Sequence, residues 1–184
     1  MRGKTTWLVI LSVAILVAVL YHAESVLATP ANSGFKPTTI ATGTFGEIDA
    51  FNQFSKNELP AGFDGDVWLS LQKTKGSSDL YVQSNVWQPG GSTGWHTHPG
   101  HTLIIVTSGT LTEYHADCTP LVHTFVPGQP APTFVDPGRD HPHIIRNEGS
   151  VAASSIAVQL VPHDPNKANR RIDAPAPENC PNIQ

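Results

Sequence analysis

Two His-x-His pairs are the residues of this chain best suited to chemistry. His96 and His98 form the first pair, His141 and His143 the second, and each pair adjoins Pro-Gly turns and strand-like runs. Residues two apart on an extended chain point to the same side, so each pair presents two imidazoles together. A small barrel enclosing both pairs could place three or four imidazoles around one point. Imidazole binds zinc, copper, iron, nickel and manganese, so the pattern predicts a metal site without naming the metal.

Short strands separated by tight turns must position these histidines. Residues 67, 69 and 71 are apolar and alternate with polar neighbours, as in a half-buried strand. Pro-Gly, Asp-Pro-Gly and Asn-Glu-Gly turns punctuate the further strand-like segments, which are residues 79–89, 101–116, 121–128, 133–136, 143–149 and 154–162. Strands this short and evenly spaced predict an all-β domain, either a barrel or a two-sheet jelly roll.

The composition favours one all-β domain and argues against a nucleic-acid partner. The chain has 16 prolines and 15 glycines, and only 14% of its residues are charged. Its formal net charge is −4 and its 11 lysines and arginines are scattered, so no nucleic-acid surface is expected. Without the N-terminal segment roughly 155 residues remain, enough for a single core.

The N-terminal segment has the pattern of a secretory signal. Two cations in "MRGK" precede an apolar run that continues through Leu20, and small residues follow at Val26 to Ala28. We expect residues 1–28 to be a signal peptide, with an uncleaved N-terminal membrane anchor or a buried helix as alternatives. A signal or an anchor places the rest of the chain in the periplasm or outside the cell. The membrane is a partner only if the segment stays uncleaved.

Changes in composition divide the remaining chain into three parts. Residues 29–62 begin with a small, polar, proline-punctuated stretch and are interpreted as a linker and N-terminal edge segment. Residues 63–162 hold the predicted barrel strands. Residues 163–184 are rich in Pro, Asn and Asp and are predicted to be an irregular C-terminal tail on the surface.

Residues 64–162 resemble the cupin superfamily in two motifs. "PGGSTGWHTHPGHTLIIVTSG" is similar to the first motif, with Gly90, His96, His98 and Gly109 in its places. "FVDPGRDHPHIIRNEG" is similar to the second, with His143 and Asn147 correctly separated. Asp140 stands where glycine is usual. The resemblance implies a cupin-type double-stranded β-helix, a jelly-roll barrel of two antiparallel sheets with a metal between them. It is strongest to small exported bacterial single-domain cupins, and implies a homodimer paired through edge strands.

The first motif departs from the family at its carboxylate. Thr102 occupies the usual glutamate position, and shifting the count by one residue gives Leu103, which is no ligand either. The resemblance then implies His96, His98 and His143 as the protein ligands of one divalent metal. This set is similar to that of three-histidine cupins, among them iron-dependent cysteine and diketone-cleaving dioxygenases. Fe(II) is therefore favoured, with Mn, Zn, Ni and Cu open. Three neutral ligands leave a net charge of +2, which favours small anions that chelate through two oxygens.

Other histidines and one glutamate leave alternatives open. His141 could replace His143 or join it, and His101 could support the site or face solvent. Glu113 lies two residues after Leu111 on the same strand, so its side chain could point inward like that of Leu111. A charged strand residue more often faces solvent, and Glu113 is left out of the predicted site. The remaining histidines are expected at the surface: His115, His123 and His163.

Two functions follow from these residues. The first is an exported metal-dependent enzyme acting on a small oxygen-rich molecule, with an Fe(II) dioxygenase favoured, in which substrate and O₂ meet at open coordination positions. The second is a cupin that binds a metal or small ligand without turning it over, since loss of the glutamate could silence the site. An isomerase or lyase is a weaker variant, because no general base adjoins the motifs.

The two cysteines are expected to form a disulfide. Cys118 lies in the turn-like "ADCTP" and Cys180 in "ENCPN", in a tail with little apolar content to hold it. An exported chain meets an oxidising compartment, where thiols tend to pair. Free or intermolecular thiols are the alternative.

Overall fold

The computed structural model describes residues 28–55, 58, 62, 67–167 and 169–184. This part of the chain contains strands and turns but no helix, and so no helix long and apolar enough to cross a membrane. The predicted signal or anchor, apart from residue 28, lies outside the described residues.

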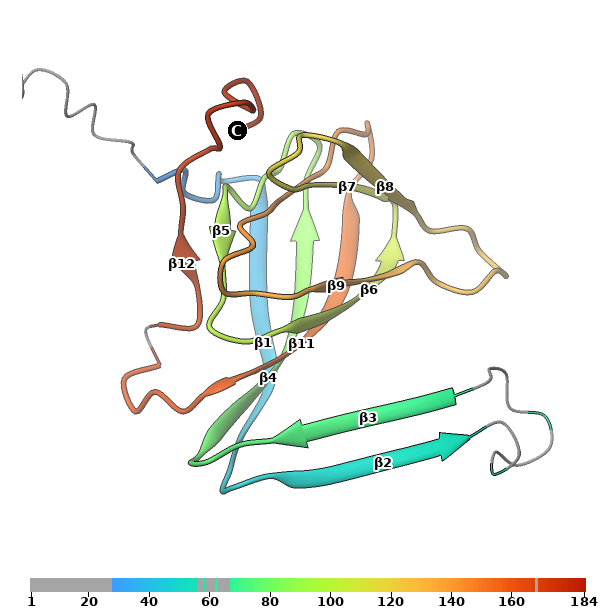
Figure 1. Cartoon of the computed structure of the whole chain (residues 1–184). Coiled ribbons are helices and arrows are strands. Elements are labelled where there is room, and N and C mark those ends of the chain that lie inside the picture. The colour runs from blue at the N-terminus through green and yellow to red at the C-terminus, as the bar shows by residue number, and fades with distance from the viewer. Residues whose placement is uncertain (1–27, 56–57, 59–61, 63–66, 168) are drawn as a thin grey trace, which may run out of the picture.

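A five-stranded antiparallel sheet forms one wall of a barrel (Figure 1). In spatial order it contains β1 (Phe35–Phe45), β4 (Ser78–Trp87), β11 (Ala153–Pro162), β6 (Thr102–Ser108) and β9 (Thr133–Asp136). The edge strand β1 precedes the predicted barrel range 63–162 in the sequence. The barrel wall therefore includes residues that lie before that range.

The opposite wall is assembled from shorter pieces. Strands β10 (Ile144–Arg146), β7 (Thr110–Tyr114) and β8 (Pro120–Thr124) form one antiparallel sheet. Beside it, β5 (His96–Thr97) pairs with β12 (Ile172–Asp173), which belongs to the C-terminal tail.

Isolated bridges join these two pieces of the second wall. Ser92 pairs with Arg146, and His96 pairs with His143. The second wall is thus continuous around the histidines, and the predicted all-β, cupin-type double-stranded β-helix of two antiparallel sheets is confirmed.

Alternating side chains fill the barrel interior. In β6, Thr102, Ile104 and Val106 are buried while the residues between them are exposed, the period of two expected of a sheet with one covered face. Trp87, Val106 and Leu111 are almost completely buried in the main core, where each contributes roughly 1.5–3 kcal/mol of burial free energy. Polar side chains replace apolar ones toward the opposite end of the interior, which becomes the site described below.

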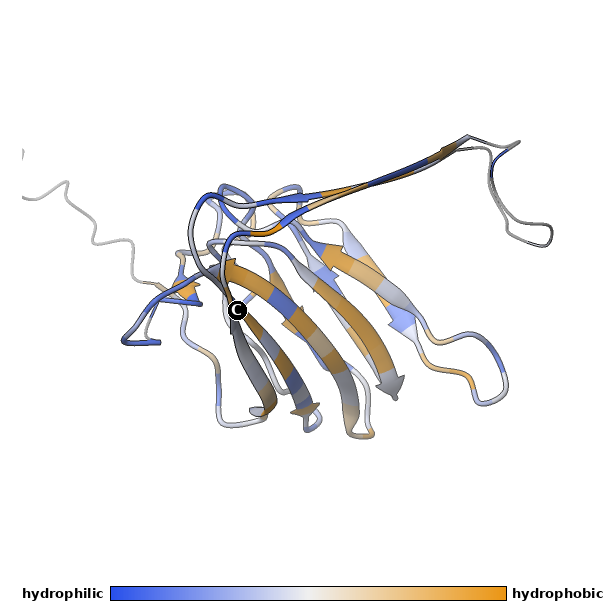
Figure 2. Ribbon diagram, turned by 90° about the horizontal axis from the view of Figure 1, so that it is seen from below, coloured by the Kyte–Doolittle hydropathy of each residue, from blue (hydrophilic) through white to orange (hydrophobic). Residues whose placement is uncertain are grey.

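A two-stranded hairpin projects from the barrel (Figures 1 and 2). Strand β3 (Val67–Lys73) pairs with β2 (Asp49–Ser55) and with no barrel strand. Three of its apolar side chains, Trp68, Leu69 and Leu71, are exposed, with Leu69 at 61% and Leu71 at 62%. The alternation predicted the strand correctly. The prediction that this strand is half-buried was wrong, because a two-stranded ribbon has no second layer to cover either face.

The C-terminal tail is fixed against the barrel at both ends. Near its start, β12 pairs with β5. Near its end, Cys180 forms the predicted disulfide with Cys118, which is confirmed, with a Cα–Cα distance of 5.7 Å. The indole Nε1 of the fully buried Trp95 donates to the Ile183 carbonyl at 2.6 Å. Residues of the C-terminal tail therefore lie beside the histidine end of the barrel interior.

Candidate metal centre

The structure brings the three predicted ligands His96, His98 and His143 together. Their nearest ring nitrogens all lie within 4.8 Å of one another. Reciprocal backbone hydrogen bonds between His96 and His143, at 3.0 and 2.9 Å, fix the two chain segments side by side. His96 and His143 are buried, and the His98 side chain is 14% exposed at the mouth of the cavity.

Hydrogen bonds on the outer side of the rings determine which nitrogens face inward. His96 Nδ1 lies 2.9 Å from the Gly94 carbonyl, and His98 Nδ1 lies 2.6 Å from the Arg170 carbonyl. A carbonyl can only accept, so both Nδ1 atoms carry hydrogen and both neutral rings present an Nε2 lone pair. Metal-binding histidines in proteins are usually oriented in this way by an outer acceptor.

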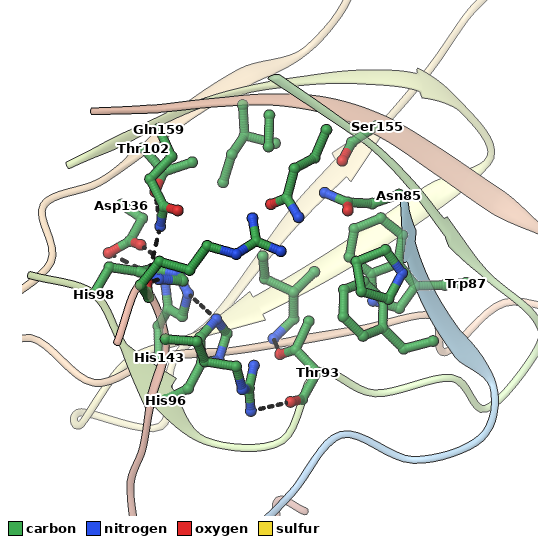
Figure 3. Close-up of a pocket in the computed structure, with 18 residues that line it drawn as sticks. Asn85, Trp87, Thr93, His96, His98, Thr102, Asp136, His143, Ser155 and Gln159 are labelled. Carbon is green, nitrogen blue, oxygen red and sulfur yellow. Dashed lines mark hydrogen bonds and ion pairs between the residues drawn. The ribbon is translucent and has the colours of Figure 1, made fainter. Parts of the chain in front are cut away.

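His143 faces carboxylates with one ring nitrogen and the other histidines with the second. Its Nδ1 lies 3.5 Å from Glu113 Oε1 and 3.7 Å from Asp136 Oδ1, and it has no hydrogen-bond partner. Its Nε2 lies 3.3 Å from the Nε2 of His96. A hydrogen on Nδ1 leaves the Nε2 lone pair for a metal, whereas in the other tautomer Nε2 donates to His96. The three rings thus turn one nitrogen each toward one region (Figure 3).

Burial keeps two of these imidazoles neutral. Desolvation lowers the pKa of His96 well below 6.5, and the neighbouring His143 and Arg171 lower it further. Desolvation also lowers the pKa of His98, partly opposed by its bond to the Arg170 carbonyl and by Asp136. Neutral imidazole is the form that binds a metal.

Two arginines from the tail line the cavity beside the histidines. Arg170 and Arg171 border a cavity of about 90 Å³, which limits an occupant to a small molecule. With its amide oriented so that Oε1 faces Arg170, Gln83 accepts from both terminal guanidinium nitrogens, at 2.8 and 3.0 Å. Arg171 donates to the Thr93 carbonyl at 2.7 Å and forms an ion pair with Asp173 at 2.6 Å. The cavity is therefore bordered by two guanidinium groups and by the carboxylate of Asp136.

A buried carboxylate stands behind His143. Glu113 is only 2% exposed, and His115 Nε2 and His123 Nε2 lie 3.3 and 3.4 Å from its two oxygens. Glu113 therefore points inward, as one of its two predicted alternatives had it, and does not face solvent. The surface positions expected for His115 and His123 were wrong, because both rings lie over this carboxylate and are only partly exposed.

The other uncertain histidines stay outside the triad. His141 is exposed, and His101 lies at a separate hollow lined by residues such as Leu160 and Gly100. His163 has the exposed position expected of it, although its Nδ1 contacts Asp79 at 2.9 Å.

Three residues of the cavity were missed in the sequence: Asp136, Arg170 and Arg171. Asp136 has the same strand parity as Phe134, a core-packing residue, and this was a usable signal that it points inward. The interpretation of "DPG" as a turn obscured it. Nothing local marks the arginines, because the contact of the tail with the barrel is entirely tertiary.

Comparison with known proteins finds only remote structural similarity. No protein-family model matches the chain, and no curated protein matches it. A Streptococcus pyogenes protein of unknown function is 19% identical over 51% of this chain and 71% of its own, with a TM-score of 0.38. A sugar phosphate isomerase from a cupin superfamily, from Silicibacter pomeroyi, is 20% identical over 46% and 51%, with a TM-score of 0.38. A polyketide cyclase from Streptomyces resistomycificus is 18% identical over 52% and 60%, with a TM-score of 0.41.

Proposed function

We propose that this chain is a small exported cupin in which His96, His98 and His143 bind one divalent metal, with Fe(II) favoured. In this proposal it acts as a mononuclear dioxygenase on a small, oxygen-rich anion. The observation that carries the proposal is the convergence of one ring nitrogen from each of the three histidines within 4.8 Å, with the Nε2 atoms of His96 and His143 3.3 Å apart. Nitrogens bound to one metal at about 2.0–2.1 Å would be roughly 2.8–3.4 Å apart, for ligand angles between octahedral and tetrahedral.

The residues present fit a metal, and Fe(II) suits both the imidazoles and the buried carboxylates nearby. When bound, Fe(II) would supply open coordination positions and redox chemistry, whereas Mn, Zn, Ni or Cu would change the reaction open to the site. Metal identity is therefore the first quantity to measure.

The chain itself would select and hold the substrate. Arg170 and Arg171 supply positive charge, and a guanidinium pairs with a carboxylate through two parallel hydrogen bonds. The apolar side chains of Ile104 and Ile145 line the same cavity. We infer that a small carboxylate or enolate is held between the arginines and the triad.

Export is supported by two features of different kinds. The N-terminal sequence has the pattern of a signal, and the disulfide between Cys118 and Cys180 is of the kind that persists in oxidising compartments. The proposed location is the periplasm or the extracellular space.

Elemental analysis of protein recovered from the export compartment, without a histidine tag, tests the first part of this proposal. We expect about one metal ion per chain, and its absence under metal-replete growth would overturn the proposal. Fe(II)-loaded protein should then consume O₂ with a member of a panel of small hydroxy-, keto- and dicarboxylates, and metal-free protein should not. Stoichiometric metal with tight carboxylate binding, but with neither O₂ consumption nor product, would favour the non-catalytic binding function instead.

A further inference from the structure

Strand pairing places a carboxylate opposite the position where the cupin motif lacks one. Thr102 on β6, which stands in the usual glutamate position, is the cross-strand partner of Asp136 on β9. Both residues are buried and line the cavity, on the side of His98 (Figure 3). Directly opposed residues of an antiparallel pair point to the same face of the sheet. Asp136 therefore enters the interior beside the place that a glutamate at residue 102 would occupy.

One oxygen of Asp136 has no hydrogen-bond partner. Oδ1 accepts from the Gly138 backbone at 2.8 Å, in the turn that follows β9. Oδ2 is buried, and no donor in the described part of the chain reaches it. An unsatisfied buried polar atom is costly, all the more in a carboxylate, so this oxygen indicates a missing partner.

A ring nitrogen of the triad lies close to that oxygen. Asp136 Oδ2 lies 3.4 Å from His98 Nε2. Nδ1 of His98 lies 2.6 Å from the Arg170 carbonyl, which can only accept, so the neutral ring carries its hydrogen on Nδ1 and its lone pair on Nε2. Two electron-pair donors therefore face each other in this tautomer. A metal bound to both at about 2.0–2.2 Å would place them roughly 2.8–3.6 Å apart, for ligand angles between octahedral and tetrahedral, and the observed distance lies in this range.

We propose that Asp136 is a fourth protein ligand, which supplies from β9 the carboxylate that the motif would place on β6. This inference rests on the proposed metal binding by His96, His98 and His143. Glu113, another buried carboxylate near the triad, lies 3.5 Å from Nδ1 of His143, the ring nitrogen that faces away from the other two histidines. A three-histidine, one-aspartate set lowers the net charge of a divalent centre from +2 to +1. This ligand set leaves fewer coordination positions on the metal for substrate. Binding of an anionic substrate would then depend more on Arg170 and Arg171.

Titration of metal-free protein with Co(II) tests the assignment, because the visible spectrum of Co(II) reports its ligands. Asp136→Asn keeps an acceptor for Gly138 but removes the charge. It should weaken Co(II) binding by more than about 100-fold, since loss of an outer partner alone costs about 10–100-fold, and it should change the visible spectrum. Glu113→Gln is the matched control and should keep the wild-type spectrum.

Moving the carboxylate across the strand pair gives the sharper test. Thr102→Glu in the Asp136→Asn background should restore most of the lost affinity for Co(II). Thr102→Glu alone should give no such gain, because it places a second carboxylate beside that of Asp136. Wild-type affinity and spectrum in Asp136→Asn would overturn the proposal, as would equal tightening by Thr102→Glu in both backgrounds. If the wild type binds no Co(II), the proposed metal centre fails instead. Circular dichroism of each metal-free variant checks folding, and Asp136→Glu, which keeps the charge and should keep Co(II) binding, replaces any variant that does not fold.

Discussion

The backbone carbonyl of Arg170 accepts a hydrogen bond from Nδ1 of His98 at 2.6 Å, while the Arg170 side chain lines the cavity. One residue of the C-terminal tail thus orients a predicted metal ligand and contributes a cation to the same site. The tail is part of the candidate centre rather than a covering of the barrel, although its sequence suggested only an irregular surface segment. Its two contributions can be separated, because a side-chain substitution leaves the carbonyl in place.

Replacing Arg170 with Gln should weaken anion binding without changing metal content. We expect about a tenfold or greater loss in the affinity of metal-loaded protein for malonate, because a charge-assisted hydrogen bond contributes about 1.5–3 kcal/mol. Isothermal titration with malonate measures this, and elemental analysis measures the metal. Arg139→Gln is the matched control, since Arg139 is exposed and does not line the cavity. Equal losses in both variants would show that only net charge matters.

Replacing His98 with Ala should remove most of the bound metal and leave a folded barrel. The ring supplies one of three converging Nε2 atoms but is not part of the main hydrophobic core. Metal per chain by elemental analysis, with the thermal unfolding midpoint as a check on folding, measures both effects. His141→Ala, in the exposed histidine of the second pair, should keep wild-type metal content. Unchanged content in His98→Ala would contradict the ligand assignment.

The metal-free protein should lose stability as pH falls below 6.5. Burial lowers the pKa values of His96 and His98, so between those values and 6.5 the unfolded chain binds more protons than the folded chain. The free energy of unfolding should therefore decrease with falling pH in this window and level off below the folded pKa values. Urea denaturation across the range measures it. His96→Gln should flatten the dependence, and a slope identical to wild type would contradict the pKa direction.

Removing the disulfide by Cys118→Ser with Cys180→Ser should lower the free energy of unfolding by about 4 kcal/mol. This is the chain-entropy value for a closure spanning 62 residues. Denaturant unfolding of the variant and the oxidised wild type gives the difference. In unreduced wild type, the peptides containing the two cysteines should co-elute and separate on reduction. Complete alkylation of both cysteines in unreduced, unfolded protein would rule out the bond.

The sequence by itself determined most strands between residues 67 and 162, the barrel class and the three histidines. Period-two alternation, Pro-Gly turns and two His-x-His pairs are local patterns, and local patterns survive without knowledge of strand partners. The disulfide was also predictable, because two cysteines allow only one intramolecular pairing.

Only the tertiary structure decided what surrounds the histidines. Asp136 lies opposite Thr102, and Glu113 lies behind His143, because non-consecutive strands pair in a particular register. Arg170 reaches His98 across 72 residues of sequence. The exposure of β3 likewise depends on which layer covers it, which alternation alone does not specify. These features depend on long-range pairing, in which the free energy comes from contacts between distant segments rather than from the conformational preferences of any one segment.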